Sequence, residues 1–207
     1  MIKGTPELIA RRREEIINAC EKLYETMSFG SITLKDIGKV TSFTRTSIYN
    51  YFESKEEIFL AMLEREYDGW ADDLKGIASE IAEPDGEKIS NAIAESLSNR
   101  QLLLKLLSVN FGDLEENSRL ELLTSFSVAY GRARDELTGL IKKACPDRTD
   151  AEIEEAVFSF LPFLHGVYPY AAVTEKQLEA MDKAKVARPA FTVRGLVCDA
   201  LMRMLPQ

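Results

Sequence analysis

The sequence predicts an all-α protein with two domains. Apolar residues recur at spacings of three and four along most of the 207 residues, and no segment alternates apolar and polar side chains as a half-buried strand does. Pro84 and Gly86 end one long helical pattern and separate it from those that follow. We therefore expect an N-terminal domain of three helices, residues 1–54, joined by a long helix to a C-terminal helical bundle, residues 55–207.

Thr5 and Pro6 predict the start of the first helix, because proline is favoured in the first helical turn. An apolar stripe then follows at helical spacing as far as Met27. The basic triplet Arg11-Arg12-Arg13 lies at the exposed beginning of this helix. Two interpretations of the triplet stay open: a solvated helix face, or a contact with phosphates or a minor groove.

Two short helices separated by a tight turn are predicted between residues 33 and 55. Thr33 and Thr44 suit the N-cap positions, since a threonine hydroxyl accepts hydrogen bonds from the amides of the first turn. The apolar residues that we expect to face the core are Leu34, Ile37 and Val40 in the first helix and Ile48 and Phe52 in the second. This order of elements is that of a helix-turn-helix.

The outward face of the second helix carries no aliphatic residue. Arginine, threonine, serine and asparagine side chains hydrogen-bond base edges and phosphates, so a polar first turn suits a helix that enters the major groove of DNA. The residues predicted to contact base edges are Thr44, Arg45, Thr46 and Asn50, with Arg45 the best candidate for a bidentate guanine contact. The residues predicted to contact phosphates are Thr33, Ser47, Tyr49, Tyr51 and Lys55.

Roughly residues 10–63 resemble the N-terminal domain of TetR-family (TetR/AcrR-like) transcriptional regulators. The features that carry the resemblance are a threonine-capped helix containing Asp36-Ile37, then a turn, the run Tyr49-x-Tyr51-Phe52, and Ser54-Lys55 before an acidic helix start. Two positions depart from the family pattern. Gly38 stands where alanine is usual, and Ser42 stands in the turn where glycine is usual, which is strained only if Ser42 adopts a positive φ.

The resemblance implies a sequence-specific DNA-binding regulator, most simply a repressor that a small-molecule effector releases from a near-palindromic operator. It also implies a homodimer that forms a four-helix bundle from residues 150–170 and 190–205 of each copy. Three alternatives stay open: an activator, an enzyme that keeps a vestigial head, and a helical protein-interaction module that does not act on DNA.

The long helix is predicted to begin at a capping box, Ser54 to Glu57, and to run from Lys55 to Ala82. At about 1.5 Å per residue it is about 40 Å long and can belong to both domains. The helical patterns expected beyond it cover residues 87–99, 102–107, 122–144, 150–168, 174–183 and 192–204.

Charge is divided unevenly along the chain. The formal net charge is −8, but residues 1–55 hold nine basic and seven acidic residues, so the remainder carries −10. A mildly basic head on an acidic body is typical of a modular DNA-binding protein.

Composition predicts a cytoplasmic protein without a membrane segment, a metal or another cofactor. The chain has no apolar run of about 18 residues and no basic-plus-apolar leader. Cys20, Cys145 and Cys198 are far apart, and His165 is the single histidine, so we expect reduced thiols rather than a zinc site or disulfides. No nucleophile motif, His-carboxylate pair or phosphate-binding glycine loop is present, so an enzyme is not expected.

Aromatic residues in the body are candidates for an effector pocket, because such pockets are mostly apolar with a few polar groups. The predicted effector-binding residues are Trp70, Phe111, Phe126, Tyr130, His165 and Tyr168. The competing interpretation is that an aromatic stripe at helical spacing, and a lone histidine on an apolar helix, belong to the core.

Overall fold

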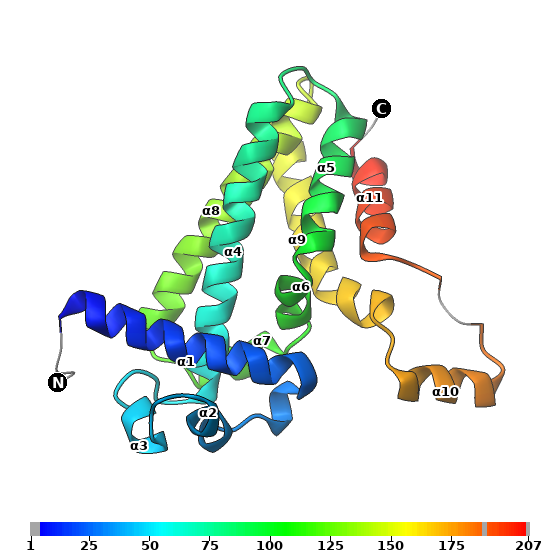
Figure 1. Ribbon diagram of the computed structural model, residues 1–207. Helices are drawn as coiled ribbons and strands as arrows, with labels where there is room; N and C mark the ends of the chain where they lie inside the picture. The colour runs from blue at the N-terminus through cyan, green and yellow to red at the C-terminus, as the bar shows by residue number, and fades with distance from the viewer. Residues whose placement is uncertain (1–4, 188–189, 206–207) are drawn as a thin grey trace. The chain divides into compact units, whose positions relative to one another are not determined.

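The computed structural model describes residues 5–187 and 190–205 (Figure 1). Within these ranges every regular element is helical, which confirms the all-α prediction. The chain divides into two compact units. The first contains Met1–Arg65 and Val109–Val128, and the second contains Glu66–Ser108 and Ala129–Gln207. The predicted boundary after residue 54 stays a prediction.

The first unit is built from the N-terminal helices and from a second, distant stretch of chain. Its N-terminal elements are α1 (Pro6–Thr26), the 3₁₀ turn η1 (Phe29–Ser31), α2 (Leu34–Val40) and α3 (Arg45–Ile48). The helices α4 (Lys55–Glu80) and α8 (Leu120–Ala144) each contribute their first part, and α7 (Phe111–Glu116) lies wholly in this unit. The sequence patterns indicated neither η1 nor α7.

An apolar core holds the three N-terminal helices and the start of α4 together. Ile16, Ile37 and Ile48 are fully buried, and the Phe59 ring meets the ring of Tyr24 edge-on at 4.9 Å between centroids. The predicted inward side of α2 is confirmed for Leu34 and Ile37 but is wrong for Val40, which is 50% exposed. Val40 is the last residue of a two-turn helix, where the chain already leaves the core for the turn.

The second unit contains the remainder of α4 and α8 with five further helices. These are α5 (Gly86–Asn99), α6 (Gln101–Leu107), α9 (Asp150–Ala171), α10 (Glu175–Ala184) and α11 (Val193–Met204). Helix α11 packs against α5 and α9, and α6 packs against α9, so α9 and α5 form the framework of this unit (Figure 1). Capping boxes at Thr149 and Thr174 begin α9 and α10.

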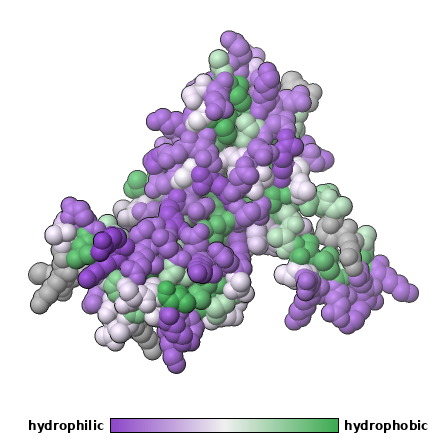
Figure 2. Space-filling model, in the orientation of Figure 1, coloured by the Kyte–Doolittle hydropathy of each residue, from purple (hydrophilic) through white to green (hydrophobic). Residues whose placement is uncertain are grey.

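Ion pairs join α4 to its neighbours within the second unit. Arg132 of α8 donates to Asp68 and Asp72, each at 2.6 Å. Arg100 donates to Asp73 at 2.6 Å. These carboxylates lie close together along α4. Because the two arginines compensate their negative charge, the acidic surface of α4 can pack beside other helices. Figure 2 shows that hydrophilic residues predominate on the visible surface.

Three properties of the described residues bear on the class of protein that the composition predicts. No single helix among them is long and apolar enough to cross a membrane. No group of three or more His, Cys, Asp or Glu side chains in the described ranges is arranged to hold a metal ion. The three cysteines are free thiols, and burial raises the pKa of Cys20 to about 12, so this thiol is protonated at neutral pH.

Two leucines of α8, one buried and one exposed, test which side chains belong to the core. Leu137 is fully buried and Leu120 is 76% exposed. We expect Leu137→Ala to lower the free energy of unfolding by about 2–5 kcal/mol, because it removes buried contacts and leaves a cavity. Leu120→Ala should change it by less than about 0.5 kcal/mol. Urea unfolding followed by circular dichroism measures both, and equal losses would contradict the assigned burial.

Candidate nucleic-acid interface

Helices α2 and α3 and the turn between them form the predicted helix-turn-helix. The Thr33 hydroxyl caps α2 by accepting from the Asp36 amide, and the Thr44 hydroxyl accepts from the Ser47 amide at the start of α3. Regular α3 covers only Arg45–Ile48, shorter than the predicted second helix. Hydrogen bonds from the amides of Tyr51 and Phe52 to the Ile48 carbonyl continue it as a turn.

The turn between the two helices is held by α1. The Glu15 carboxylate accepts from the Ser42 amide at 2.9 Å and from the Ser42 hydroxyl at 2.6 Å. These two hydrogen bonds hold the pKa of Glu15 below its ordinary value. Among the described residues Lys185 is the only non-glycine with a positive φ, so Ser42 adopts its turn conformation without the strain considered above.

Most residues predicted to contact DNA are exposed. Thr44, Thr46 and Asn50 are exposed in or beside α3, and Tyr49 is 44% exposed. Thr33 is exposed at the start of α2, and Ser47 is partly exposed. Arg45 begins α3, but its side chain lies outside the described part of the structure. The exposed polar side of α3 is therefore free of aliphatic side chains from Thr44 to Asn50.

Tyr51 and Lys55 are engaged inside the first unit. Tyr51 is only 4% exposed, and its hydroxyl accepts from Arg12 at 3.0 Å. Lys55 donates to the Phe29 carbonyl at 2.8 Å, and its ammonium lies 4.3 Å from the centroid of the Phe29 ring. Their contacts with phosphate stay predictions, and both residues have a structural role in addition.

Two arginines of the basic triplet support the end of α3. Arg13 donates to the Tyr51 carbonyl at 3.3 Å and lies over the Phe52 ring, 4.5 Å from its centroid. Arg12 lies 5.9 Å from the centroid of the Phe43 ring besides its bond to the Tyr51 hydroxyl. Arg11 is exposed. The two open interpretations of the triplet therefore omitted a third role, the positioning of the turn that follows α3.

A buried ion pair ties the start of α4 to the start of α8. The Glu57 side chain is 1% exposed and accepts from Arg119 three times: from Nε at 2.7 Å, from Nη2 at 2.9 Å and from the backbone amide at 3.1 Å. Glu57 also accepts from the Glu53 amide at 2.7 Å. The predicted capping box is thus half formed, because Glu57 bonds the Glu53 amide while its own amide donates to Ser54.

These hydrogen bonds keep Glu57 charged. Burial of the carboxylate by itself raises its pKa, but the hydrogen bonds from Arg119 and from the Glu53 amide outweigh burial and hold the pKa below the ordinary value. The same pairing raises the pKa of Arg119. A bidentate guanidinium is the group that best compensates a carboxylate removed from water.

The six predicted effector residues are divided between the two units. Phe111 and Phe126 belong to the first unit, where their rings pack 5.4 Å apart. Trp70 and Tyr130 belong to the second unit, and each contacts the ring of Tyr67. Trp70 is fully buried, and its indole N–H has no hydrogen-bond partner. On α9, His165 is exposed and Tyr168 is partly exposed.

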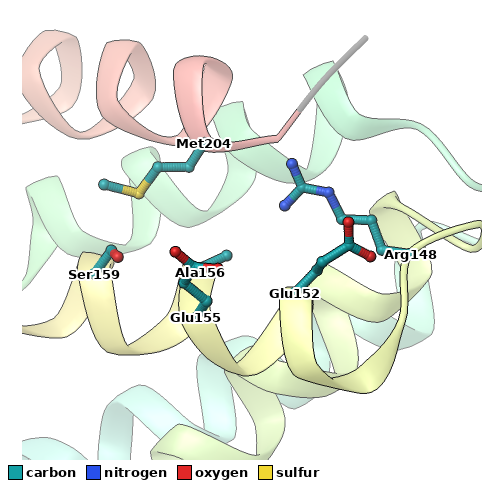
Figure 3. Close-up of a pocket in the computed structure, with 6 residues that line it drawn as sticks. All are labelled: Arg148, Glu152, Glu155, Ala156, Ser159 and Met204. Atoms are coloured by element: carbon teal, nitrogen blue, oxygen red, sulfur yellow. The ribbon is translucent and has the colours of Figure 1, made fainter.

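Two surface pockets of the second unit border α9. One, of about 310 Å³, lies between α9 and α11, with Met204 facing Ser159 at one end and Arg148 beside Glu152 at the other (Figure 3). The other, of about 250 Å³, lies between α8 and α9 and includes Phe158. Neither contains a predicted effector residue, and their charged linings differ from the mostly apolar lining of a small-molecule site.

Two family models match the chain. Residues 16–62 match the one described as "Bacterial regulatory proteins, tetR family", and residues 64–205 match "Tetracyclin repressor-like, C-terminal domain". Among curated proteins, the uncharacterized HTH-type transcriptional regulator YfiR of Bacillus subtilis is 34% identical over 62 residues, 30% of this chain and 30% of that protein. The uncharacterized HTH-type transcriptional regulator Rv1255c of Mycobacterium tuberculosis is 30% identical over 98 residues, 45% of this chain and 48% of that protein. The chain thus spans less than half the length of either relative.

Solved structures with the same fold cover nearly the whole chain. The fatty acid degradation regulator FadR from Bacillus halodurans has a TM-score of 0.61 at 14% identity, over 99% of this chain and 97% of that one. FadR from Bacillus subtilis, in complex with stearoyl-CoA, has a TM-score of 0.61 at 14% identity, over 93% and 97%. At this identity the likeness shows the fold alone.

The buried pair predicts a pH dependence of stability. Because the folded pKa of Glu57 lies below its ordinary value near 4.5, the stabilisation is complete above that pH and is lost as the pH falls through the folded pKa. We expect Glu57→Gln to lower the free energy of unfolding at neutral pH by about 2–4 kcal/mol, less than for full burial because the Arg119 side chain is 35% exposed.

Urea unfolding of both proteins at neutral pH and at about pH 3.5 measures this difference, which should shrink at the lower pH. Glu121→Gln is the matched control, since this exposed carboxylate lies 3.6 Å from Arg119 and should matter little. A difference that stays constant with pH would contradict a charged Glu57.

Proposed function

Since this chain belongs to the TetR family of bacterial regulatory proteins, we propose that it is a sequence-specific DNA-binding transcriptional regulator of the cytoplasm. In this proposal the protein is a homodimeric repressor that leaves its operator when a small-molecule effector occupies the second unit. The observation that carries the proposal is the exposed polar side of α3 in a helix-turn-helix whose turn is held by Glu15 of α1.

The proposed DNA contacts follow from residue type and exposure. Thr44, Arg45, Thr46 and Asn50 would contact base edges, because hydroxyl, guanidinium and amide groups hydrogen-bond them in the major groove. Thr33, Ser47 and Tyr49 would contact phosphates. Arg12 and Arg13 support the reading side, because Arg12 donates to the Tyr51 hydroxyl and Arg13 donates to the Tyr51 carbonyl.

A homodimer suits this reading head, because one short helix reads only a few base pairs. Two-fold symmetry places two such heads about 34–36 Å apart on one face of the DNA. The exposed side of α9 supports the proposed interface, since it presents Phe158 at 50% exposure together with Pro162, His165 and Pro169 at helical spacing. Helix α11 packs beside α9 and would complete a four-helix bundle with the partner copy.

The proposed effector site is centred on Trp70. A buried indole N–H without a partner is a donor available to a bound molecule, and the rings of Tyr67 and Tyr130 form an apolar surrounding in the same unit. Phe111, Phe126, His165 and Tyr168 stay predictions. Long-chain acyl-CoA is the first class of compound to screen, since a structural relative is described in complex with stearoyl-CoA.

The experiment that tests the proposal is fluorescence anisotropy of the purified protein. The duplex is taken from immediately upstream of its own gene, with random duplex as reference and with salt varied. A regulator should bind as two protomers per site, prefer this duplex and lose affinity steeply with salt. A genome-wide selection of DNA fragments that the protein binds is the second step. If it also yields no preferred fragment, and binding is insensitive to salt, the alternative of a helical protein-interaction module replaces the proposal.

Replacement of Arg45 tests base readout. We expect Arg45→Ala to weaken operator binding by about 1–3 kcal/mol and to relax specificity, because a bidentate base contact is lost. Lys22→Ala is the control, since it removes one exposed positive charge on α1. Competition anisotropy against operators with single base-pair changes measures specificity. Equal losses on operator and random duplex for Arg45→Ala would contradict base reading.

Replacement of Phe158 tests the proposed dimer. We expect Phe158→Glu to raise the dimer dissociation constant at least tenfold, because it would place a charge in an apolar interface. Leu120→Glu introduces the same charge at an exposed leucine of the first unit and should leave dimerisation unchanged. Sedimentation equilibrium measures both. A fully dimeric Phe158→Glu protein would show that the interface lies elsewhere.

A further inference from the structure

We propose that Arg119 is a positioning residue for the DNA-reading helix, so that operator affinity depends on the turn that begins α8. The inference rests on the proposed function, because it assigns a supporting residue to the same reading site. Arg119 lies outside the helix-turn-helix in sequence, yet its guanidinium reaches the last turn after α3.

One guanidinium joins the two chain segments that flank the reading side. Nη2 of Arg119 donates to the Glu57 carboxylate at 2.9 Å and to the Tyr51 carbonyl at 3.3 Å. Nε donates to the other oxygen of Glu57 at 2.7 Å. The fork geometry of arginine allows both contacts at once, whereas a lysine ammonium could not span them in the same plane.

Arg119 acts on the reading helix through Tyr51. Its amide donates to the Ile48 carbonyl at 2.8 Å and thereby closes the turn that continues α3. Its carbonyl accepts from both Arg13 and Arg119, each at 3.3 Å. Carbonyls at a helix end lack partners within the helix, so these two arginines fix where the end of α3 lies.

Ser54 joins the start of α4 to the segment before α8 by a second contact, in addition to that of Arg119. The Ser54 hydroxyl accepts from the Glu57 amide and donates to the Asn117 carbonyl at 2.8 Å. The start of α4 is therefore joined to residues 117–119 at two places. Since α4 follows Tyr51 after only three residues, movement of residues 117–119 would displace the end of α3 as well.

Two substitutions at Arg119 test the proposal, with a matched control on the same helix. Arg119→Gln removes the charge and the fork, and Arg119→Lys keeps the charge alone. Arg132→Gln removes an arginine of α8 that pairs with Asp68 and Asp72 in the second unit. Circular dichroism confirms folding, and anisotropy measures binding to the operator and to random duplex.

The positioning role predicts at least a tenfold loss of operator affinity for Arg119→Gln and at least a threefold loss for Arg119→Lys. Binding to random duplex, and operator binding by Arg132→Gln, should change less than twofold. If Arg119→Gln does not fold, the result for Arg119→Lys decides. Operator affinity within twofold of the unmodified protein, for a folded Arg119 variant, would overturn the proposal.

Amide exchange by NMR provides a readout that is independent of DNA. In Arg119→Lys the amides of Tyr51 and Phe52 should exchange at least tenfold faster, while those of Asp36 and Ile37 in α2 change less than twofold. A uniform change would indicate general destabilisation and would also overturn the proposal. If the unmodified protein prefers no DNA sequence, the proposed function fails, and the exchange rates still decide whether Arg119 positions the end of α3.

Discussion

The first unit depends on one buried negative charge. Glu57 lies in the first turn of α4 with almost no exposed surface, and a carboxylate in that environment is stable only when several donors compensate it. Its neighbours in sequence supply one donor, the Glu53 amide, and the remaining three come from Arg119. The requirement to compensate this charge therefore brings the beginning of α8 to the base of the helix-turn-helix.

The same requirement explains why the first unit is assembled from separate stretches of chain. Arg119 serves Glu57 and Tyr51 together, and Arg13 reaches Tyr51 from α1. The side of α3 that faces away from these contacts carries exposed polar residues, among them Thr44, Thr46 and Asn50. The unit thus concentrates these charged interactions at the end of the reading helix, where they determine its position, and presents polar residues on its outward side.

Much of the fold could be predicted from patterns among residues that are close together in the sequence. A threonine cap is recognised from a few adjacent residues, and the predicted caps at Thr33 and Thr44 are present. The pairing of Glu57 with Arg119 spans 62 residues, and no sequence pattern marks it. Val40 fits the helical spacing of a core residue and is nevertheless exposed, because spacing does not show where a short helix leaves the core. For the same reason, aromatic spacing did not reveal that Phe111 and Trp70 belong to different units.

The discontinuous composition of the first unit has a consequence for the construction of chimeric regulators. A head taken as one N-terminal segment would lose Val109–Val128, and with it the guanidinium that satisfies the Glu57 carboxylate. Transplanted into a body with an unrelated residue at that position, Glu57 would be buried without its counter-ion. A functional graft must therefore carry two segments, or replace Glu57 with a neutral side chain at the junction.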